Sequence, residues 1–128
     1  MNNADLNKLG GIILDSSITV HKELGPGLLE SAYELALAHE LGLRGIRCRS
    51  QVPVELKYKN VSLGKAYVMD ILVENEIVIE IKCADVLHPV YTAQIISYLK
   101  LSQKKLGFLV NFHVPLIKDG IKRFVNNL

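Results

Sequence analysis

Two charged residues interrupt an apolar segment that has the character of a buried strand. Residues 77–83 are rich in β-branched side chains, and only Glu80 and Lys82 are charged. A short apolar run of this kind predicts a strand that is buried on both faces. Because side chains alternate along a strand, Glu80 and Lys82 project from one face, the same face as Val78. Burying an acid and a base is costly unless they are paired or bind a ligand, so we expect chemistry here.

A third charged residue, Asp70, lies in the preceding predicted strand, again among apolar side chains. If a three-residue loop joins the strands, Val73 pairs with Ile77, and Asp70 then stands directly opposite Glu80 on one face. A two-residue loop would turn Asp70 to the other face. Asn75 tolerates the left-handed conformation that three-residue loops usually need, which favours the first register.

Two carboxylates one strand apart repel each other, and a divalent cation relieves that repulsion. Ligands that are all oxygen suit Mg²⁺ or Mn²⁺ rather than Zn²⁺. The cation could polarise a phosphate and lower the pKa of a bound water, while Lys82 holds that water or the developing negative charge. Such a group is suited to phosphodiester hydrolysis. In the alternative interpretation the three charges pair internally, which predicts no affinity for metal.

The elements that must position these residues follow from hydrophobic periodicity and from turn residues. The pattern predicts the order α-α-β-β-β-α-β, which is an α/β or α+β domain with a mixed central sheet flanked by helices. We expect helices at residues 6–24, 28–41 and 89–104, and strands at 52–59, 65–73, 77–83 and 107–111. The tail, residues 117–125, could be a short helix or an edge strand.

Composition places the chain among soluble globular proteins, since 49% of the 128 residues are hydrophobic and 22% are charged. We expect one domain over residues 1–128. The net charge of +2 is too small to indicate a nucleic-acid partner by itself. No apolar stretch is long enough for a membrane helix. The two cysteines form no disulfide framework, so a cytoplasmic location is expected.

The spacing Asp70…Glu80-Ile81-Lys82 resembles the D…(D/E)-X-K core of the PD-(D/E)XK nuclease superfamily, with Met69 where the superfamily often has proline. The chain is more closely similar to one small branch, the GxxExxY proteins, whose name motif matches residues 27–33. The resemblance runs from about residue 12 to residue 125. Further matching segments are residues 78–82, 93–99, 107–112 and 117–123.

The resemblance implies a restriction-endonuclease-like core, a Mg²⁺ or Mn²⁺ cofactor and a nucleic-acid partner, DNA foremost. It also implies roles for particular residues. These are Asp70 and Glu80 as metal ligands together with the Ile81 carbonyl, Lys82 as the catalytic lysine, Glu30 as the acid of the preceding helix, and Gln94 as the polar residue of the following helix.

Several of these residues also have a purely structural interpretation. Glu30 could be an acid that the helix dipole favours in a first turn. We expect Tyr33 to be a core residue with its hydroxyl at the rim of the site. Gln94 and Tyr98 share one helix face, which could pack against the sheet or contact substrate. Two basic clusters are solvated by default, although they could bind phosphates: Arg44, Arg47 and Arg49, and Lys100, Lys104 and Lys105.

Two functional hypotheses therefore stand. The first is a magnesium-dependent nuclease that uses Asp70, Glu80 and Lys82. The second is a catalytically silent module that binds nucleic acid or protein and keeps the nuclease fold. A second copy of so small a chain could supply further surface for nucleic acid, which leaves a homodimer open.

Overall fold

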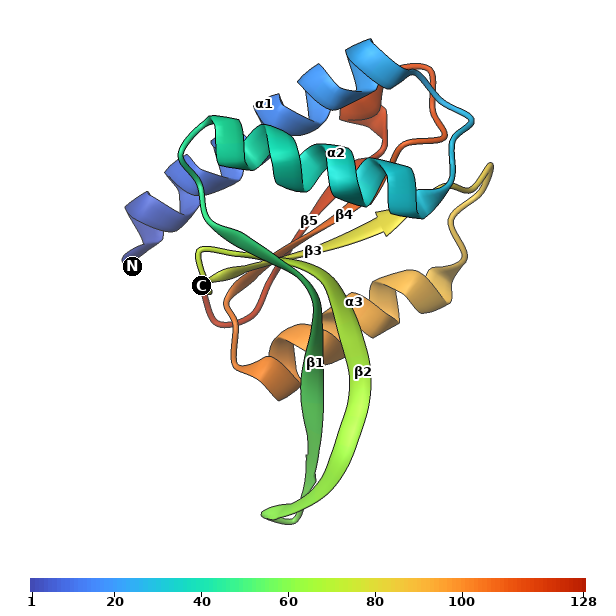
Figure 1. Ribbon diagram of the computed structural model, residues 1–128. Helices are drawn as coiled ribbons and strands as arrows, with labels where there is room; N and C mark the ends of the chain where they lie inside the picture. Colours follow the sequence, from blue (N-terminus) through green and yellow to red (C-terminus); the bar gives the residue numbers. More distant parts are fainter.

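A five-stranded sheet separates two layers of helices in the computed structural model, which describes residues 1–128 (Figure 1). The strands lie in sequence order, and only β3 and β4 pair in parallel. This is the predicted α/β architecture with a mixed sheet. None of the helices combines the length and the hydropathy needed to cross a bilayer. The elements are α1 (Asn3–Leu24), α2 (Glu30–Leu43), β1 (Cys48–Tyr58), β2 (Val61–Val73), β3 (Ile77–Lys82), α3 (Pro89–Ser102), β4 (Leu106–Asn111) and β5 (Ile121–Val125).

The central strand β3 divides the core into two parts. Ile77, Ile79 and Ile81 pack into the larger cluster beneath α1 and α2, while Val78 packs with Leu99 of α3 on the other face. Figure 1 shows the same arrangement, with α1 and α2 on one side of the sheet and α3 on the other. The face that Val78 shares with the two charged residues of β3 is therefore the α3 face, as strand alternation requires.

The helix α3 connects the two parallel strands, because a parallel pair cannot be joined by a tight turn. Its predicted start at Pro89 is confirmed, and the preceding His88 caps it by accepting a hydrogen bond from the main-chain N–H of Val90 (3.0 Å). It ends at Ser102, two residues before the predicted end, because Gln103 adopts a left-handed conformation (φ 57°).

The hairpin of β1 and β2 is longer than predicted and projects away from the body of the molecule (Figure 1). Lys59 and Asn60 both have positive φ angles (51° and 65°), so a two-residue turn joins Tyr58 directly to Val61. The sequence pattern had predicted the second strand only from residue 65, which left residues 61–64 outside it. Pairing to the partner strand keeps them extended instead.

The C-terminal segment contains both of the structures between which the sequence left a choice. A short 3₁₀ helix, Ile117–Asp119, precedes β5, which pairs antiparallel with β4 and adds a fifth strand to the sheet. Between them, Gly120 passes so close to the main chain of Asn111 that a Cβ atom would lie 2.2 Å from the Asn111 carbonyl oxygen. Only glycine fits there.

Candidate active site

The connection between β2 and β3 sets which residues face each other. Val73 pairs with Ile77, so the three-residue register is confirmed. The loop contains two left-handed residues, Glu74 (φ 51°) and Asn75 (φ 57°), where the sequence pattern had required one. Main-chain pairing in this register extends over three residue pairs and then stops.

Asp70 and Glu80 occupy the next position of that register, and there side chains replace the main-chain ladder. Glu80 Oε2 accepts a hydrogen bond from the Asp70 main-chain N–H (3.1 Å), and Asp70 Oδ2 accepts one from the Ile81 N–H (2.8 Å). Each carboxyl group is thus tied to the other's strand. The strands separate where the two acids meet.

Gln51 of β1 lies opposite Asp70 and marks the same irregularity. Its main chain is left-handed (φ 54°), and it makes no ladder pair between its paired neighbours. Its side-chain amide donates to Glu34 Oε1 of α2 (2.6 Å). Burial raises the pKa of Glu34, and the charge of Asp70 adds to the rise. The structure therefore brings a second α2 acid toward the site, one turn after Glu30, and only that i, i+4 spacing could have indicated it.

Glu80 is held in surroundings that disfavour its charge. Only 5% of the residue is exposed. Burial raises its pKa to about 9, with the neighbouring charge of Asp70 and a hydrogen bond between the two carboxyl groups adding to the shift. The charge of Lys82 acts in the opposite direction but is the smallest of the causes. Without a cation, Glu80 is therefore protonated at neutral pH.

Lys82 is half-buried and does not form an ion pair with either acid. Its ammonium nitrogen lies 4.4 Å from the ring centroid of Tyr91, in a cation–π contact. The five ion pairs of the structure lie elsewhere, so Lys82 forms no salt bridge with Asp70 or Glu80. The main chain is fixed by a hydrogen bond from the Phe112 N–H to the Lys82 carbonyl (3.0 Å).

Asn111 holds the segment that follows β3. Its buried side-chain amide donates to the Ala84 carbonyl (2.8 Å), and its oxygen accepts from the N–H groups of Ala84 and His113 (both 3.1 Å). All three hydrogen bonds of this side chain go to main-chain groups, two at Ala84 after β3 and one at His113 after β4. Sequence reasoning had assigned Asn111 no role beyond a matching motif.

Two tyrosines cover the carboxyl groups on the α3 side. Tyr98 stacks on Tyr67 of β2 with ring centroids 3.5 Å apart. Burial raises the pKa of Tyr98, and the charges of Glu80 and Asp70 add to the rise. Gln94 is half-buried on the same helix.

Tyr33 requires a correction. Its side chain is completely buried and its ring stacks on Phe112 at 4.3 Å. The hydroxyl donates to the Gly25 carbonyl and accepts from the Leu28 N–H (3.2 Å), so it closes the turn between α1 and α2. With no exposed surface, Tyr33 is a packing residue and does not contribute to the rim of the site.

Glu30 is the first residue of α2 and is exposed. Burial, and then the charge of Glu30, raise the pKa of the Cys83 thiol, which places this acid near the end of β3. The structure thus brings Glu30 toward the residue after Lys82, whereas it brings Glu34 toward Asp70.

The donor set at Asp70 and Glu80 fits a hard divalent cation. It consists of carboxyl oxygens from two adjacent strands, and a positive charge would replace the proton that burial forces onto Glu80. No group of three or more His, Cys, Asp or Glu side chains gathers closely enough to hold a metal. Any further ligands would be the Ile81 carbonyl, water or substrate, and Mg²⁺ usually keeps several waters.

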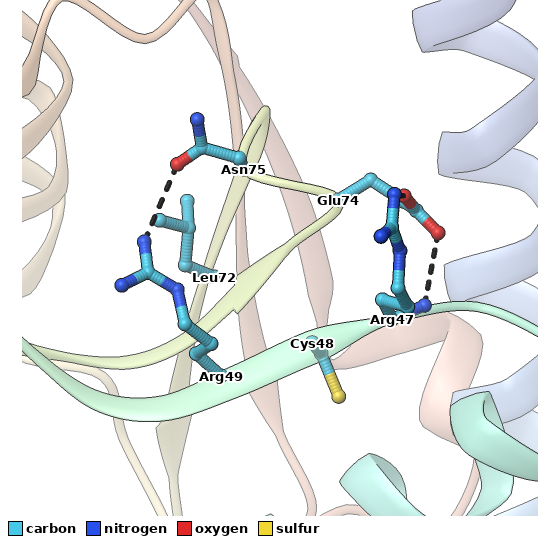
Figure 2. A pocket seen from close by; sticks show the side chains of 6 residues that line it. All are labelled: Arg47, Cys48, Arg49, Leu72, Glu74 and Asn75. Atoms are coloured by element: carbon cyan, nitrogen blue, oxygen red, sulfur yellow. Dashed lines mark hydrogen bonds and ion pairs between the residues drawn. The ribbon is translucent and has the colours of Figure 1, made fainter.

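The predicted basic cluster of Arg44, Arg47 and Arg49 lies away from the two acids of the site. Figure 2 shows a pocket at the β2–β3 turn, where Arg47 faces Glu74 (3.7 Å) and Arg49 donates to Asn75 Oδ1 (3.3 Å). Arg44 forms ion pairs with acids of α1 and α2. This basic cluster therefore serves local contacts, at the opposite end of the hairpin from Asp70.

Comparisons with known proteins show which family the chain belongs to. No curated protein matches the sequence. One solved structure, described as "Crystal structure of SSO0001", is similar with 19% identity and a TM-score of 0.40, over 91% of this chain and 76% of that one. The model of the PD-(D/E)XK nuclease superfamily matches residues 7–124, which is nearly the whole chain. The chain therefore belongs to the PD-(D/E)XK nuclease superfamily.

Proposed function

We propose that this protein is a nuclease that hydrolyses phosphodiester bonds with the help of Mg²⁺ or Mn²⁺, and that it belongs to the GxxExxY branch of its superfamily. Nucleases of this superfamily typically use divalent metals. The observation that carries the proposal is the meeting of Asp70 and Glu80, with Lys82 two residues further along the same strand. DNA is the proposed substrate.

In this proposal the two acids and the Ile81 carbonyl hold the cation. When bound, the cation would supply positive charge that offsets both carboxylates and polarises the phosphodiester. The hydrogen bonds from the main-chain N–H groups of Asp70 and Ile81 fix the two carboxyl groups in advance, so little reorganisation is required.

Besides the cation, Lys82 provides a positive charge at the site. Its ammonium group orients the attacking water or stabilises the negative charge that develops on the phosphate. The ring of Tyr91 keeps this group within the site while leaving its N–H donors free of any carboxylate. Gln94 offers an amide to the water or the phosphate from α3. The stacked pair of Tyr67 and Tyr98 limits access of bulk water to Glu80.

The acids of α2 have supporting roles in this proposal. Glu30 stays the motif acid, and we assign it to the outer side of the site, near Cys83. Glu34 helps to position Asp70 through Gln51, because the Gln51 amide binds Glu34 at the place where β1 leaves its regular pairing with Asp70.

Isothermal titration of Mg²⁺ and of Mn²⁺ into the wild type and into Asp70→Ala tests the metal site. The same proteins are then incubated with labelled single- and double-stranded DNA and RNA. We expect metal binding and Mn²⁺-dependent cleavage in the wild type, and neither in Asp70→Ala. Asp15→Ala is the matched control, since Asp15 is an exposed acid of α1, and it should behave as the wild type does.

A wild type that binds no metal would overturn the catalytic proposal and leave a nuclease fold that serves as a silent binding module. Metal binding that persists in Asp70→Ala would show that the ion binds elsewhere. It would overturn the assignment of this carboxylate.

A further inference from the structure

The outer part of the β1–β2 hairpin, residues 55–65, is an arm that projects from the molecule (Figure 1). Every residue of the arm except Leu56 is exposed, including Tyr58 (61%) and Leu63 (59%). A hairpin that packs against little of its own chain gains little from burial. Its length therefore calls for an explanation outside the folded core.

The arm concentrates the positive charge of the protein. It carries Lys57, Lys59 and Lys65 against one acid, Glu55, which accepts a hydrogen bond from the Ser62 hydroxyl. These residues give the arm a net charge of +2, which equals the net charge of the whole chain. The other residues together carry as many acids as bases, so the positive excess lies on the arm.

The end of α3 extends this basic surface. A groove of about 300 Å³ between the base of the arm and α3 is lined by two lysines, Lys57 and Lys104, and by one acid, Glu55. A neighbouring hollow at the end of α3 is lined by Lys100 and Lys105 and by no acidic residue. Lysines from two elements that are far apart in sequence thus border adjoining hollows.

We propose that the arm and the end of α3 bind the sugar-phosphate backbone of a nucleic-acid duplex, and hold it along β2 so that one phosphate reaches Asp70 and Glu80. This inference rests on the proposed function. Asp70 lies nine residues after Val61 along β2, a span of up to about 30 Å. That length is close to one turn of B-DNA, about 34 Å, and a two-stranded ribbon fits the major groove.

The outer edge of the arm argues against a second copy of the chain as its occupant. β1 is an edge strand, but Pro53 has no N–H to donate, and the register shifts on both sides of Glu55. Prolines, irregular pairing and lysines are the features by which edge strands avoid pairing with another chain. Phosphates, in contrast, match the exposed ammonium groups.

Binding is measured by fluorescence anisotropy with a labelled DNA duplex of about two helical turns, in EDTA so that cleavage is suppressed. The arm variant is Lys57→Gln, Lys59→Gln and Lys65→Gln combined. The control variant changes three exposed lysines of α1 and β5, Lys8, Lys22 and Lys122, to glutamine. Both variants lower the net charge by the same amount, and circular dichroism checks that both fold.

We expect the arm variant to bind at least about tenfold more weakly and the slope of log affinity against log salt to fall by about two to three. The control should stay within about threefold of the wild type. Equal losses in both variants, or no binding by the wild type, would overturn the proposal. A wild-type dimer that the arm substitutions convert to a monomer would also overturn it, since the arm would then bind a second copy.

Asp70→Ala separates this proposal from the proposed function. If the arm binds the duplex, Asp70→Ala should bind it in EDTA at least as tightly as the wild type, because the substitution removes an acid that would repel the phosphate. Loss of duplex binding in Asp70→Ala, with the arm intact and the fold preserved, would contradict the arm as the main binding surface.

Discussion

The two ends of the β2–β3 hairpin each hold a glutamate, but in opposite electrostatic surroundings. At the turn, Glu74 accepts a hydrogen bond from the Arg47 main-chain N–H (2.9 Å) and faces the Arg47 guanidinium (Figure 2). At the other end, Glu80 lies beside a second acid, and no cation of the chain forms an ion pair with it. One carboxylate is matched locally, and the other is left without a matching charge.

This difference shows which end of the hairpin lowers the stability of the folded protein. Glu74, which stabilises the turn, pairs with Arg47 at the surface. A surface ion pair of this kind contributes little to the stability of the folded protein. A buried pair of acids lowers the stability of the folded protein until positive charge arrives from outside. The comparison therefore supports the Asp70 end, and not the pocket of Figure 2, as the place for chemistry.

Lys82→Met should produce the largest effect, because it removes the ammonium group beside the acids and keeps an unbranched side chain of similar length. We expect the rate of Mn²⁺-dependent DNA cleavage to fall by about 10²- to 10³-fold, with a smaller change in metal affinity. Single-turnover cleavage and metal titration provide the two readouts. Arg49→Met, at the turn, is the control and should stay within about twofold of the wild type. A Lys82→Met variant that cleaves normally would refute the catalytic role of this lysine.

Glu80→Gln should stabilise the metal-free protein by about 2 kcal/mol at pH 8. The pKa of Glu80 is about 9 when folded and near its ordinary value of 4.5 when unfolded. The folded state therefore binds the extra proton, and wild-type stability falls as pH rises from about 4.5 to about 9. Glutamine stays neutral throughout and can donate to Asp70, so its advantage grows over that range.

Urea denaturation in EDTA at several pH values measures this difference. The matched variant Glu74→Gln, at the other end of the hairpin, should lower stability by no more than about 1 kcal/mol and should show no such growth with pH. If Glu80→Gln were less stable than the wild type at pH 8, the description of Glu80 as a buried, protonated acid would fail.

Tyr91→Leu should have a smaller effect, because it removes the ring that positions Lys82 but leaves the lysine in place. Cation–π contacts contribute about 0.5–2 kcal/mol, so we expect cleavage to slow by about three- to tenfold. Tyr91→Phe retains the ring and should restore the rate. Equal rates in the leucine and phenylalanine variants would show that the contact has no part in turnover.

Tyr67→Phe should have the smallest effect. The Tyr67 hydroxyl is buried and has no hydrogen-bond partner, so removing it should raise stability by about 0.5–1 kcal/mol. The stack on Tyr98 remains, and metal affinity should not change. Thermal unfolding measures the gain. A clear loss of stability would mean that the hydroxyl has a partner in solution.

Local pattern was sufficient for the parts of the site that lie close together in sequence. Counting the loop between Val73 and Ile77 left two registers open and favoured the one that places Asp70 opposite Glu80, which the structure confirms. Proline before a helix and apolar runs in strands predicted α3, β3 and β4, since each depends on neighbouring residues only.

Other parts depended on helix phase and on irregular pairing. Glu34 rather than Glu30 approaches Asp70 because of how α2 lies over the sheet. Gln51 interrupts the ladder through a left-handed main chain that its residue type does not predict. Tyr33 was expected in the core with its hydroxyl at the rim of the site; it is a core residue, but its hydroxyl binds the turn between the first two helices.

By itself, the sequence determined the fold class and the three charged residues proposed for the site, and it favoured the register of the β2–β3 hairpin that the structure shows, because short loops and strand alternation depend on local geometry. Only the tertiary structure decided what surrounds those residues. The stacking of Tyr98 on Tyr67 and the contact of Lys82 with Tyr91 join segments from different elements. Their positions follow from the packing of α3 against the sheet, a long-range arrangement that no local pattern encodes.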